Sequence, residues 1–250
     1  MKKAIAVCTL CALLLSAFPL PSAAAPGDVV VRVNTYAELA AAAADPNCEV
    51  IEGMEDIVLN AQIALTHSVS IQGNGFTVSV PVPGLLDSGV LNTADNISAF
   101  RAFAATAPQT SISLSNLKII GGRMEGGGIY VAGGATVSLD RVTITRSGGG
   151  QSIPGGGINN AGTIYIRNSQ INRNAARHGG GFLNTGTMVI ENSSFSENRS
   201  LSSGGGGGAG ENQGKLYINN CTFSNNKSTE LGGAINDYKG MAYIMNSTFT

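Results

Sequence analysis

The 250-residue sequence contains no tryptophan and few charged side chains, which make up 12% of it against about 25% in ordinary soluble proteins. A disordered chain needs many charges and few apolar residues, whereas 43% of this chain is hydrophobic. Its eight prolines are too few for a collagen-like chain. The formal net charge of −1 argues against a general nucleic-acid-binding protein, because such proteins carry basic surfaces.

Cysteine and histidine are also scarce. Two histidines, His67 and His178, lie far apart in the sequence. The four cysteines are Cys8, Cys11, Cys48 and Cys221. The first two fall in the leader described below, and the two that remain are too few and too distant for a disulfide scaffold. No metal-ligand spacing remains either, so the sequence predicts no metal site and no cofactor.

Glycine, in contrast, is abundant, with 34 residues in the chain. Each interior glycine destabilises a helix by roughly 1 kcal/mol relative to alanine, which excludes a mainly helical fold. The excess is local, because 28 of the 34 glycines lie from Leu117 onward. This distribution favours a β protein in which glycines mark recurring turns and close contacts.

Residues 1–24 have the layout of a secretory signal peptide. Lys2 and Lys3 precede an apolar run that ends in small residues and is short for a membrane span. Cleavage after Ala24 would change the net charge from −1 to −3, since it removes two lysines. We therefore expect an exported chain, secreted or at the cell surface, that starts at Ala25 and has no lipid anchor and no membrane span. A retained amino-terminal anchor helix is the alternative.

A repeat of about 26 residues dominates residues 111–250. An aliphatic residue is followed five positions later by an apolar or aromatic one, and the second members are spaced by 25, 27, 24, 28 and 26 residues. The first members are Leu114, Leu139, Ile166, Ile190, Ile218 and Ile244. Each repeat also carries a glycine motif, and the motifs begin at Gly126, Gly155, Gly179, Gly207 and Gly232.

Short alternating stretches bounded by glycine and asparagine predict strands. One such repeat cannot close a core, so successive repeats must stack at about 4.8 Å. The sequence therefore predicts an all-β fold, a right-handed parallel β-helix or solenoid. Stacking would place asparagines in two columns at tight turns, where asparagine tolerates a left-handed backbone. The columns are Asn116, Asn168, Asn192, Asn220 and Asn246, and Asn174, Asn198 and Asn226.

We expect one β-helix domain over residues 25–250, with an amino-terminal cap and first strands in 25–60. The alanine-rich stretch from Tyr36 to Ala44 predicts a short helix that covers the open end. Strands are expected near 57–59, 63–65 and 69–71. Residues 81–110 lose the alternation and are expected to form a protruding loop. Because Thr250 falls within a repeat, we also expect the chain to be the amino-terminal piece of a longer protein.

Two motifs alternate along the repeats. Gly-Gly-Ala-Ile occurs at 232–235, and Phe-x-x-Asn occurs at 195–198 and 223–226. This pairing resembles the repeats of the polymorphic outer membrane proteins, and more widely those of β-helical surface proteins of the pectin-lyase-like class. The resemblance implies a surface-exposed adhesin with a β-helical passenger. Most repeats of this chain carry Gly-Gly-Gly instead of Gly-Gly-Ala.

Two outward columns are candidate binding surfaces. Stacking places Arg146, Arg173 and Glu197 in one column, and Arg177 and His178 follow in the next loop. The column is either a site for an anionic ligand or a solvated face with a weak ion pair. A second, broken column of tyrosines either binds sugar rings or a partner or reflects strand propensity. Its members are Tyr165, Tyr217 and Tyr243.

A lyase of this fold would need clustered carboxylates that hold Ca²⁺, together with a basic residue. A hydrolase would need two carboxylates close together. The acids of the repeat region are scattered: Glu125, Asp140, Glu191, Glu197, Glu211, Glu230 and Asp237. Asp140 and Glu191 share a column but lie two coils apart, at about 9.6 Å. Asp237, beside a strand, is the acidic residue that is hardest to dismiss as a catalytic candidate. No catalytic residue is predicted.

The sequence thus favours a secreted or surface-displayed adhesion or binding module. Its expected partner is a host-cell or extracellular glycan or protein. Binding to nucleic acid is not expected. Two alternatives remain open: a carbohydrate-active enzyme on the same fold, either a polysaccharide lyase or a glycoside hydrolase, and a structural spacer.

Overall fold

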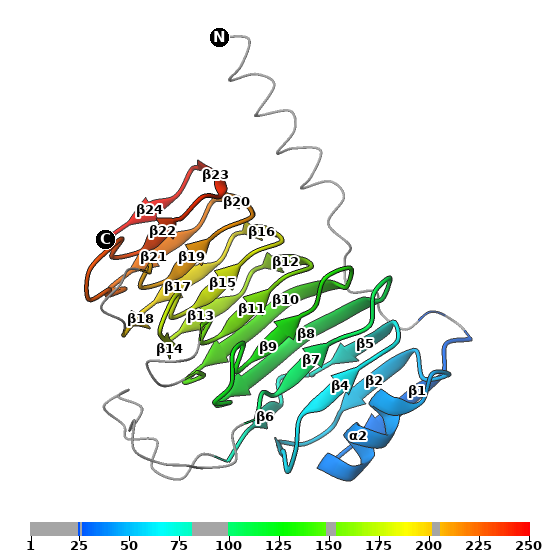
Figure 1. Cartoon of the computed structure of the whole chain (residues 1–250). Helices are drawn as coiled ribbons and strands as arrows, with labels where there is room; N and C mark the ends of the chain where they lie inside the picture. Colours follow the sequence, from blue (N-terminus) through cyan, green and yellow to red (C-terminus); the bar gives the residue numbers. More distant parts are fainter. Residues whose placement is uncertain (1–24, 26, 82–99, 149–153, 202–205) are drawn as a thin grey trace.

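The computed structural model describes residues 25, 27–81, 100–148, 154–201 and 206–250. They form a right-handed parallel β-helix, in which the strands of each coil pair in parallel with those of the next (Figure 1). The predicted fold class and the repeat of about 26 residues per coil are therefore confirmed. Because successive coils stack in parallel, equal positions of the repeat lie side by side along the solenoid.

The largest sheet has 15 strands. Its main path runs through β1 (Val30–Val33), β2 (Val50–Gly53), β5 (Val69–Gln72), β8 (Ser111–Ile120), β10 (Thr136–Thr145), β12 (Thr163–Arg167), β16 (Thr187–Glu191), β20 (Lys215–Asn219) and β23 (Met241–Met245). Beside this path lie β3 (Ile57–Val58), β6 (Thr77–Ser79), β13 (Gln170–Asn172), β17 (Ser194–Ser196), β21 (Thr222–Ser224) and β24 (Thr248–Phe249). β8 and β10 each run through both parts, which are separate strands in later coils.

A second sheet of seven strands forms another wall of the solenoid. It contains β4 (Ile63–Leu65), β7 (Phe103–Ala105), β9 (Ile129–Val131), β11 (Ile158–Asn160), β15 (Phe182–Asn184), β19 (Gly210–Asn212) and β22 (Ile235–Asp237). A two-stranded sheet pairs β14 (Ala175–Ala176) with β18 (Arg199–Ser200). The strands expected near 57–59, 63–65 and 69–71 are thus present as β3, β4 and β5.

The core consists of aliphatic ladders that run along the solenoid. Leu114 pairs with Leu139, and the same column continues through Ile166, Ile190 and Ile218. All five side chains are buried, and each burial stabilises the fold by roughly 1.5–3 kcal/mol. This confirms the expected ladder at five of its six positions, whereas Ile244 continues the column but is 43% exposed.

Helix α2 (Tyr36–Ala44) lies at the β1 end of the solenoid, where the sequence predicts a cap (Figure 1). Thr35 begins the helix with a capping box: its side chain accepts a hydrogen bond from the main-chain N–H of Glu38, whose carboxylate accepts from Thr35 N–H. Leu39 and two alanines of α2 are buried in the main core cluster. The helix therefore covers apolar surface of the first coils.

The structure contradicts the loop expected over 81–110 at its carboxyl-terminal part. Residues 82–99 lie outside the described residues, whereas Phe103–Ala105 forms strand β7, which pairs with β4 and β9. All three residues of β7 are buried. A strand that is buried on both faces shows no apolar–polar alternation, which explains why the pattern missed it.

The turns carry left-handed residues at the first predicted asparagine column. Asn116, Asn168, Asn192, Asn220 and Asn246 have φ between 49° and 52°, and Arg141 occupies the same column with φ 54°. At the second column the prediction is wrong, because the left-handed backbone falls one residue earlier, at Arg173, Glu197 and Asn225. Glycines serve a second purpose, which is close stacking. A Cβ at Gly156 would collide with the main-chain carbonyls of Gly180 and Ala175 on neighbouring segments. Glycine in the repeats therefore permits backbone contact between coils.

The two described cysteines, Cys48 and Cys221, are buried free thiols. Burial raises the pKa of Cys221 from 9.0 to about 11. Between those values the unfolded chain loses the thiol proton while the folded chain keeps it, so the free energy of unfolding must fall as pH rises. We expect this residue to account for a loss of about 2–3 kcal/mol.

Urea unfolding of the protein and of Cys221→Ala across this alkaline range measures the effect. Other alkaline groups titrate in both proteins, but only the parent protein has the Cys221 thiol. The free energy of unfolding should therefore fall more steeply with pH in the parent protein. Parallel curves for the two proteins would contradict the prediction.

Candidate functional site

An open groove of about 370 Å³ lies on the outer face of the solenoid beside the carboxyl-terminal parts of β8 and β10 and strand β13. Its lining residues are Lys118, Ile120, Thr143, Thr145, Arg146, Gln170, Asn172 and Arg173. We call it the cationic groove, because it contains three basic residues and no acidic one. The residues meet there because alternate positions of stacked strands point to the same face.

Strand register fixes the floor of the cationic groove. Thr143 pairs with Lys118 on one side and with Gln170 on the other, so three successive coils each contribute one side chain. Thr145 and Asn172 are paired in the next column, and Thr145 Oγ1 donates to Asn172 Oδ1 at 2.6 Å. This hydrogen bond holds the Asn172 amide beside the hydroxyl and gives the groove a polar, ordered floor.

Arg146 and Arg173 stand at one wall of the groove, each directly after a strand. Both have left-handed backbones, with φ 55° and 54°, and the column continues through Glu197 and Asn225. Arg173 Nε lies 3.1 Å from Glu197 Oε2. Both side chains are about half exposed, so water screens this ion pair and it contributes about 0–1 kcal/mol. The predicted column of Arg146, Arg173 and Glu197 is therefore present in the structure.

The structure does not bring Arg177 and His178 into this groove. His178 Nδ1 lies 3.1 Å from Glu211 Oε2, and Gln213 Nε2 donates to the other Glu211 oxygen at 2.7 Å. The Arg177 main-chain carbonyl accepts from Ser200 Oγ at 2.8 Å. The expectation that Arg177 and His178 join the column of Arg146 and Arg173 is thus corrected, because the segment after β14 directs His178 to a buried carboxylate on another coil.

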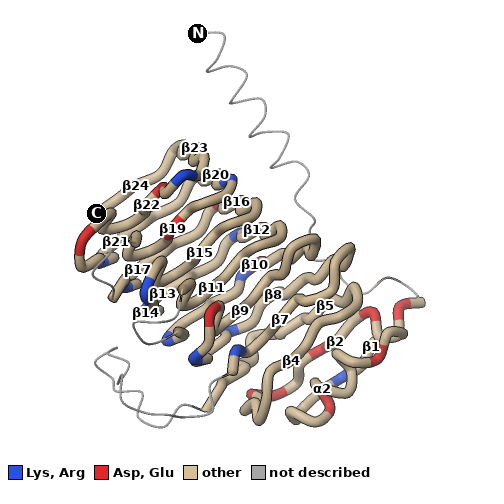
Figure 2. The backbone as a smooth tube through the Cα atoms, in the orientation of Figure 1, with Lys and Arg blue, Asp and Glu red and all other residues tan. Residues whose placement is uncertain are grey.

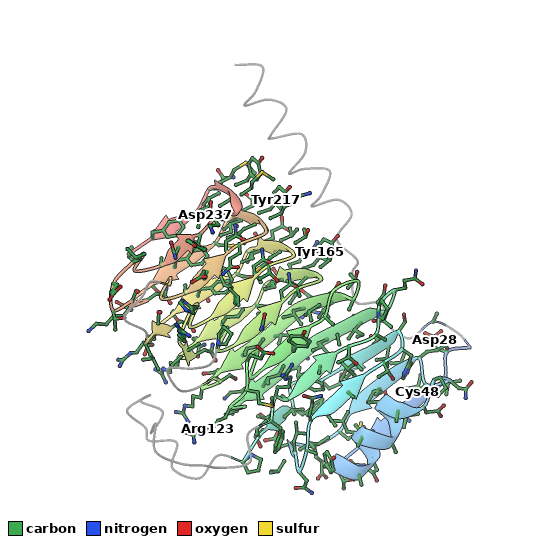
Figure 3. The ribbon with its side chains drawn as sticks, in the orientation of Figure 1. Asp28, Cys48, Arg123, Tyr165, Tyr217 and Asp237 are labelled. Atoms are coloured by element: carbon green, nitrogen blue, oxygen red, sulfur yellow. The ribbon has the colours of Figure 1, made fainter. Side chains whose placement is uncertain are left out.

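The tyrosine column is a packed ridge. Tyr165, Val189, Tyr217 and Tyr243 are register partners on four successive coils and pack together. The rings of Tyr217 and Tyr243 are stacked, with centroids 5.2 Å apart and an interplanar angle of 8°. Their facing surfaces are therefore covered, so they cannot bind a sugar ring there. Figure 3 shows Tyr165 and Tyr217 on the same side of the solenoid.

The acidic residues that the sequence offers as catalytic candidates form contacts with other side chains. Asp140 and Glu191 do share a column, but Arg167 lies between them and its Nε is 3.4 Å from Glu191 Oε2. Asp140 Oδ1 also accepts from Asn168 Nδ2 at 2.7 Å. Asp237 accepts from Asn212 Nδ2 at 2.6 Å. Across the described residues, no three His, Cys, Asp or Glu side chains are grouped so that they could hold a metal ion.

Sequence reasoning missed part of the cationic groove. Lys118, Thr143 and Gln170 each precede the second apolar member of a repeat pair by one position. That constant offset was a usable signal, because it predicts one outward column. The sequence does not show, however, that this column lies beside the column of Arg146 and Arg173.

Comparison with known proteins gives one positive result. The model of a family described as "Putative pectate lyase-like adhesive domain" matches residues 30–230. No curated protein and no solved structure matches the chain. In the described part of the chain, no helix has the length and apolar character needed to cross a membrane.

Proposed function

We propose, from the premise that the chain belongs to the pectate lyase-like adhesive domain family, that it is a non-catalytic adhesion module whose cationic groove binds an anionic extracellular ligand. The observation that carries the proposal is the placement of Lys118, Arg146 and Arg173 around one polar floor with no acidic lining residue. Such a site attracts carboxylate or sulfate groups and fixes them by charge-assisted hydrogen bonds.

The spacing of the basic groups suits an extended anionic polymer. Arg146 and Arg173 occupy the same position on successive coils, which are about 4.8 Å apart. A guanidinium group can donate two parallel hydrogen bonds to one carboxylate. An acidic polysaccharide that lies along the solenoid could therefore place successive anionic groups near successive arginines.

Surface display and secretion are part of the proposal. Residues 1–24 have the layout of a signal peptide, and the Gly-Gly-Ala-Ile and Phe-x-x-Asn motifs resemble those of polymorphic outer membrane proteins, which are surface-exposed adhesins. The proposal is non-catalytic because Asp140, Glu191 and Asp237, the acids that could serve a hydrolase, are held by asparagine or arginine partners.

The test is binding of the purified chain from Ala25 to immobilised heparin and polygalacturonate. The double substitution Arg146→Ala and Arg173→Ala should weaken binding about tenfold or more, since it removes two charge-assisted contacts. Binding should also weaken as salt concentration rises. Surface plasmon resonance measures both effects.

The matched control is Arg177→Ala with Arg199→Ala, which removes the same charge from exposed positions outside the groove. It should retain most of the binding. Equal losses of affinity in the two double variants would attribute the effect to net charge and would contradict a specific site in the groove. Release of unsaturated or shortened sugars from either polymer would overturn the non-catalytic part.

A further inference from the structure

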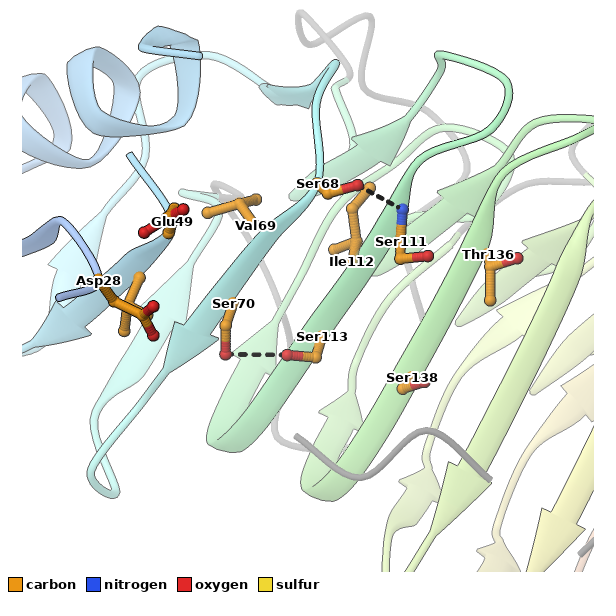
Figure 4. Close-up of a pocket in the computed structure, with 11 residues that line it drawn as sticks. Asp28, Glu49, Ser68, Val69, Ser70, Ser111, Ile112, Ser113, Thr136 and Ser138 are labelled. Atoms are coloured by element: carbon orange, nitrogen blue, oxygen red, sulfur yellow. Dashed lines mark hydrogen bonds between the residues drawn. The ribbon is translucent and has the colours of Figure 1, made fainter. Parts of the chain in front are cut away.

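A second open recess, of about 380 Å³, lies on the outer face of the first coils (Figure 4). We call it the serine trough, because hydroxyl side chains line it on three successive coils. They are Ser68, Ser70, Ser111, Ser113, Thr136 and Ser138. Asp28 and Glu49 stand at one end, and Val50, Val69 and Ile112 lie beneath the trough, each 2–3% exposed.

Side-chain size along one column creates the trough. Ser70, Ser113 and Ser138 are register partners, and the next member of the same column is Tyr165, where the tyrosine ridge begins. The outer face is therefore recessed over three coils, a length of about 10 Å from first to third, and rises at Tyr165. Small residues at these positions leave room for a ligand where later coils fill it with rings.

The hydroxyls of the trough are partly ordered. Ser113 Oγ donates to Ser70 Oγ at 2.9 Å, and Ser68 Oγ accepts from Ser111 N–H at 2.9 Å (Figure 4). A hydroxyl can donate one hydrogen bond and accept two, so these pairs retain capacity for a polar ligand. The trough thus offers a row of hydroxyl groups that matches the hydroxyls of a sugar ring.

The carboxylates give the trough a negative end. Glu49 Oε2 accepts from Val29 N–H at 3.1 Å, and Asp28 Oδ2 accepts from Ala25 N–H at 2.6 Å. Each therefore keeps one carboxylate oxygen that has no hydrogen-bond partner among the described residues. Residues 27–81 contain seven acidic residues and one basic residue, and Figure 2 shows acidic positions gathered around α2, β1 and β2. The trough therefore repels anions and favours a cation.

We propose that the serine trough is a second binding site, which takes a short saccharide with free amino groups, of the glucosamine class. The ammonium group would bind Glu49, while ring hydroxyls would exchange hydrogen bonds with Ser70 and Ser113. A lysine side chain would use the carboxylates only and leave the hydroxyls without ligand partners. The site is independent of the cationic groove, whose charge has the opposite sign.

The experiment is calorimetric titration of the chain from Ala25 with a β-1,4-linked glucosamine tetramer, in weakly acidic buffer that keeps the amines protonated. The fully N-acetylated tetramer is the comparison ligand, because acetylation removes the charge and keeps the ring. We expect the free amine to bind about tenfold more tightly or better. Equal affinity of the two tetramers, or no binding of either, would overturn the proposal.

Two variants locate the site. Ser113→Tyr introduces at the trough the residue that occupies the same column at Tyr165, Tyr217 and Tyr243, so it should fill the recess without disturbing the fold and abolish binding. Glu49→Gln should weaken binding about tenfold. The control Glu55→Gln makes the same charge change at an exposed position outside the trough and should leave affinity within about twofold.

Full affinity in Ser113→Tyr, with its unfolding midpoint unchanged, would overturn the assignment. A second variant keeps the test valid if Ser113→Tyr unfolds: Ser70→Leu blocks the same recess from the preceding coil, where Ser70 is only partly buried. An oligolysine that binds as tightly as the tetramer would overturn the saccharide class. The variant with Arg146→Ala and Arg173→Ala should bind the amino sugar normally, so failure of the proposed adhesion site and failure of this site are distinguishable.

Discussion

Replacing Asn184 with leucine should lower the free energy of unfolding by about 3–5 kcal/mol, because the substitution breaks a buried ladder and leaves several polar groups without partners. Asn184 Nδ2 donates to Asn212 Oδ1 at 2.7 Å and to the Lys215 carbonyl at 3.0 Å. Its own Oδ1 accepts from Asn160 Nδ2 at 2.7 Å. All three asparagines are 0% exposed, so water cannot replace the lost bonds. Urea unfolding followed by circular dichroism measures the change.

The control is Gln170→Leu, which places the same apolar side chain at an exposed position on β13. We expect this variant to stay within about 0.5 kcal/mol of the parent protein. A loss of less than about 1 kcal/mol for Asn184→Leu would show that the ladder adds little beyond filling space. Similar losses in both variants would assign the effect to the new leucine.

This ladder was the part of the fold that was hardest to predict from the sequence. The two columns that contain Asn168 and Asn174 were predicted because their asparagines follow the strand pairs at constant offsets. Asn160, Asn184 and Asn212 follow the glycine motifs instead, each at the end of a three-residue strand of the second sheet. Their common position was readable, but alternation over three residues is too short to identify a strand.

Asp237 shows the same limit for single residues. It follows Asn212 in this ladder, and its carboxylate accepts a hydrogen bond from Asn212 Nδ2. In the sequence it is the hardest acid to dismiss as a catalytic candidate, because it stands next to a strand and near Tyr238. Only the register of β19 with β22 reveals that the partner lies 25 residues away.

For the candidate site, periodicity predicted the column of Arg146 and Arg173 but not the groove. Columns are a property of one repeat length, which the sequence contains. Grooves depend on how large the side chains of neighbouring columns are and how strands turn, as the change from Ser138 to Tyr165 shows for the serine trough. His178 likewise meets Glu211 across coils, and that contact depends on the path of a loop that no period describes.

Replacing Phe195 with alanine should lower the free energy of unfolding by about 3–5 kcal/mol, since a fully buried aromatic side chain leaves a cavity in a core that cannot collapse. Phe195 stacks on Phe223 with centroids 5.0 Å apart and meets Phe182 edge to face at 5.6 Å. Phe223 is the register partner of Phe195 on the next coil, whereas Phe182 lies on another wall of the same coil. The cavity would therefore weaken interfaces between coils, which are the units that stabilise a solenoid.

The position along the stack makes this prediction specific. Phe249, the next member of the same column, stacks on Phe223 at 4.8 Å and is 44% exposed in this 250-residue chain. Phe249→Ala should therefore cost only about 1–2 kcal/mol, because less area is removed from the core. Hydrogen exchange should show local opening near β24 in that variant, and opening on both sides of β17 in Phe195→Ala. The prediction assumes that burial, and not ring stacking alone, sets the stability of each coil. Equal losses of unfolding free energy in the two variants would contradict that assumption.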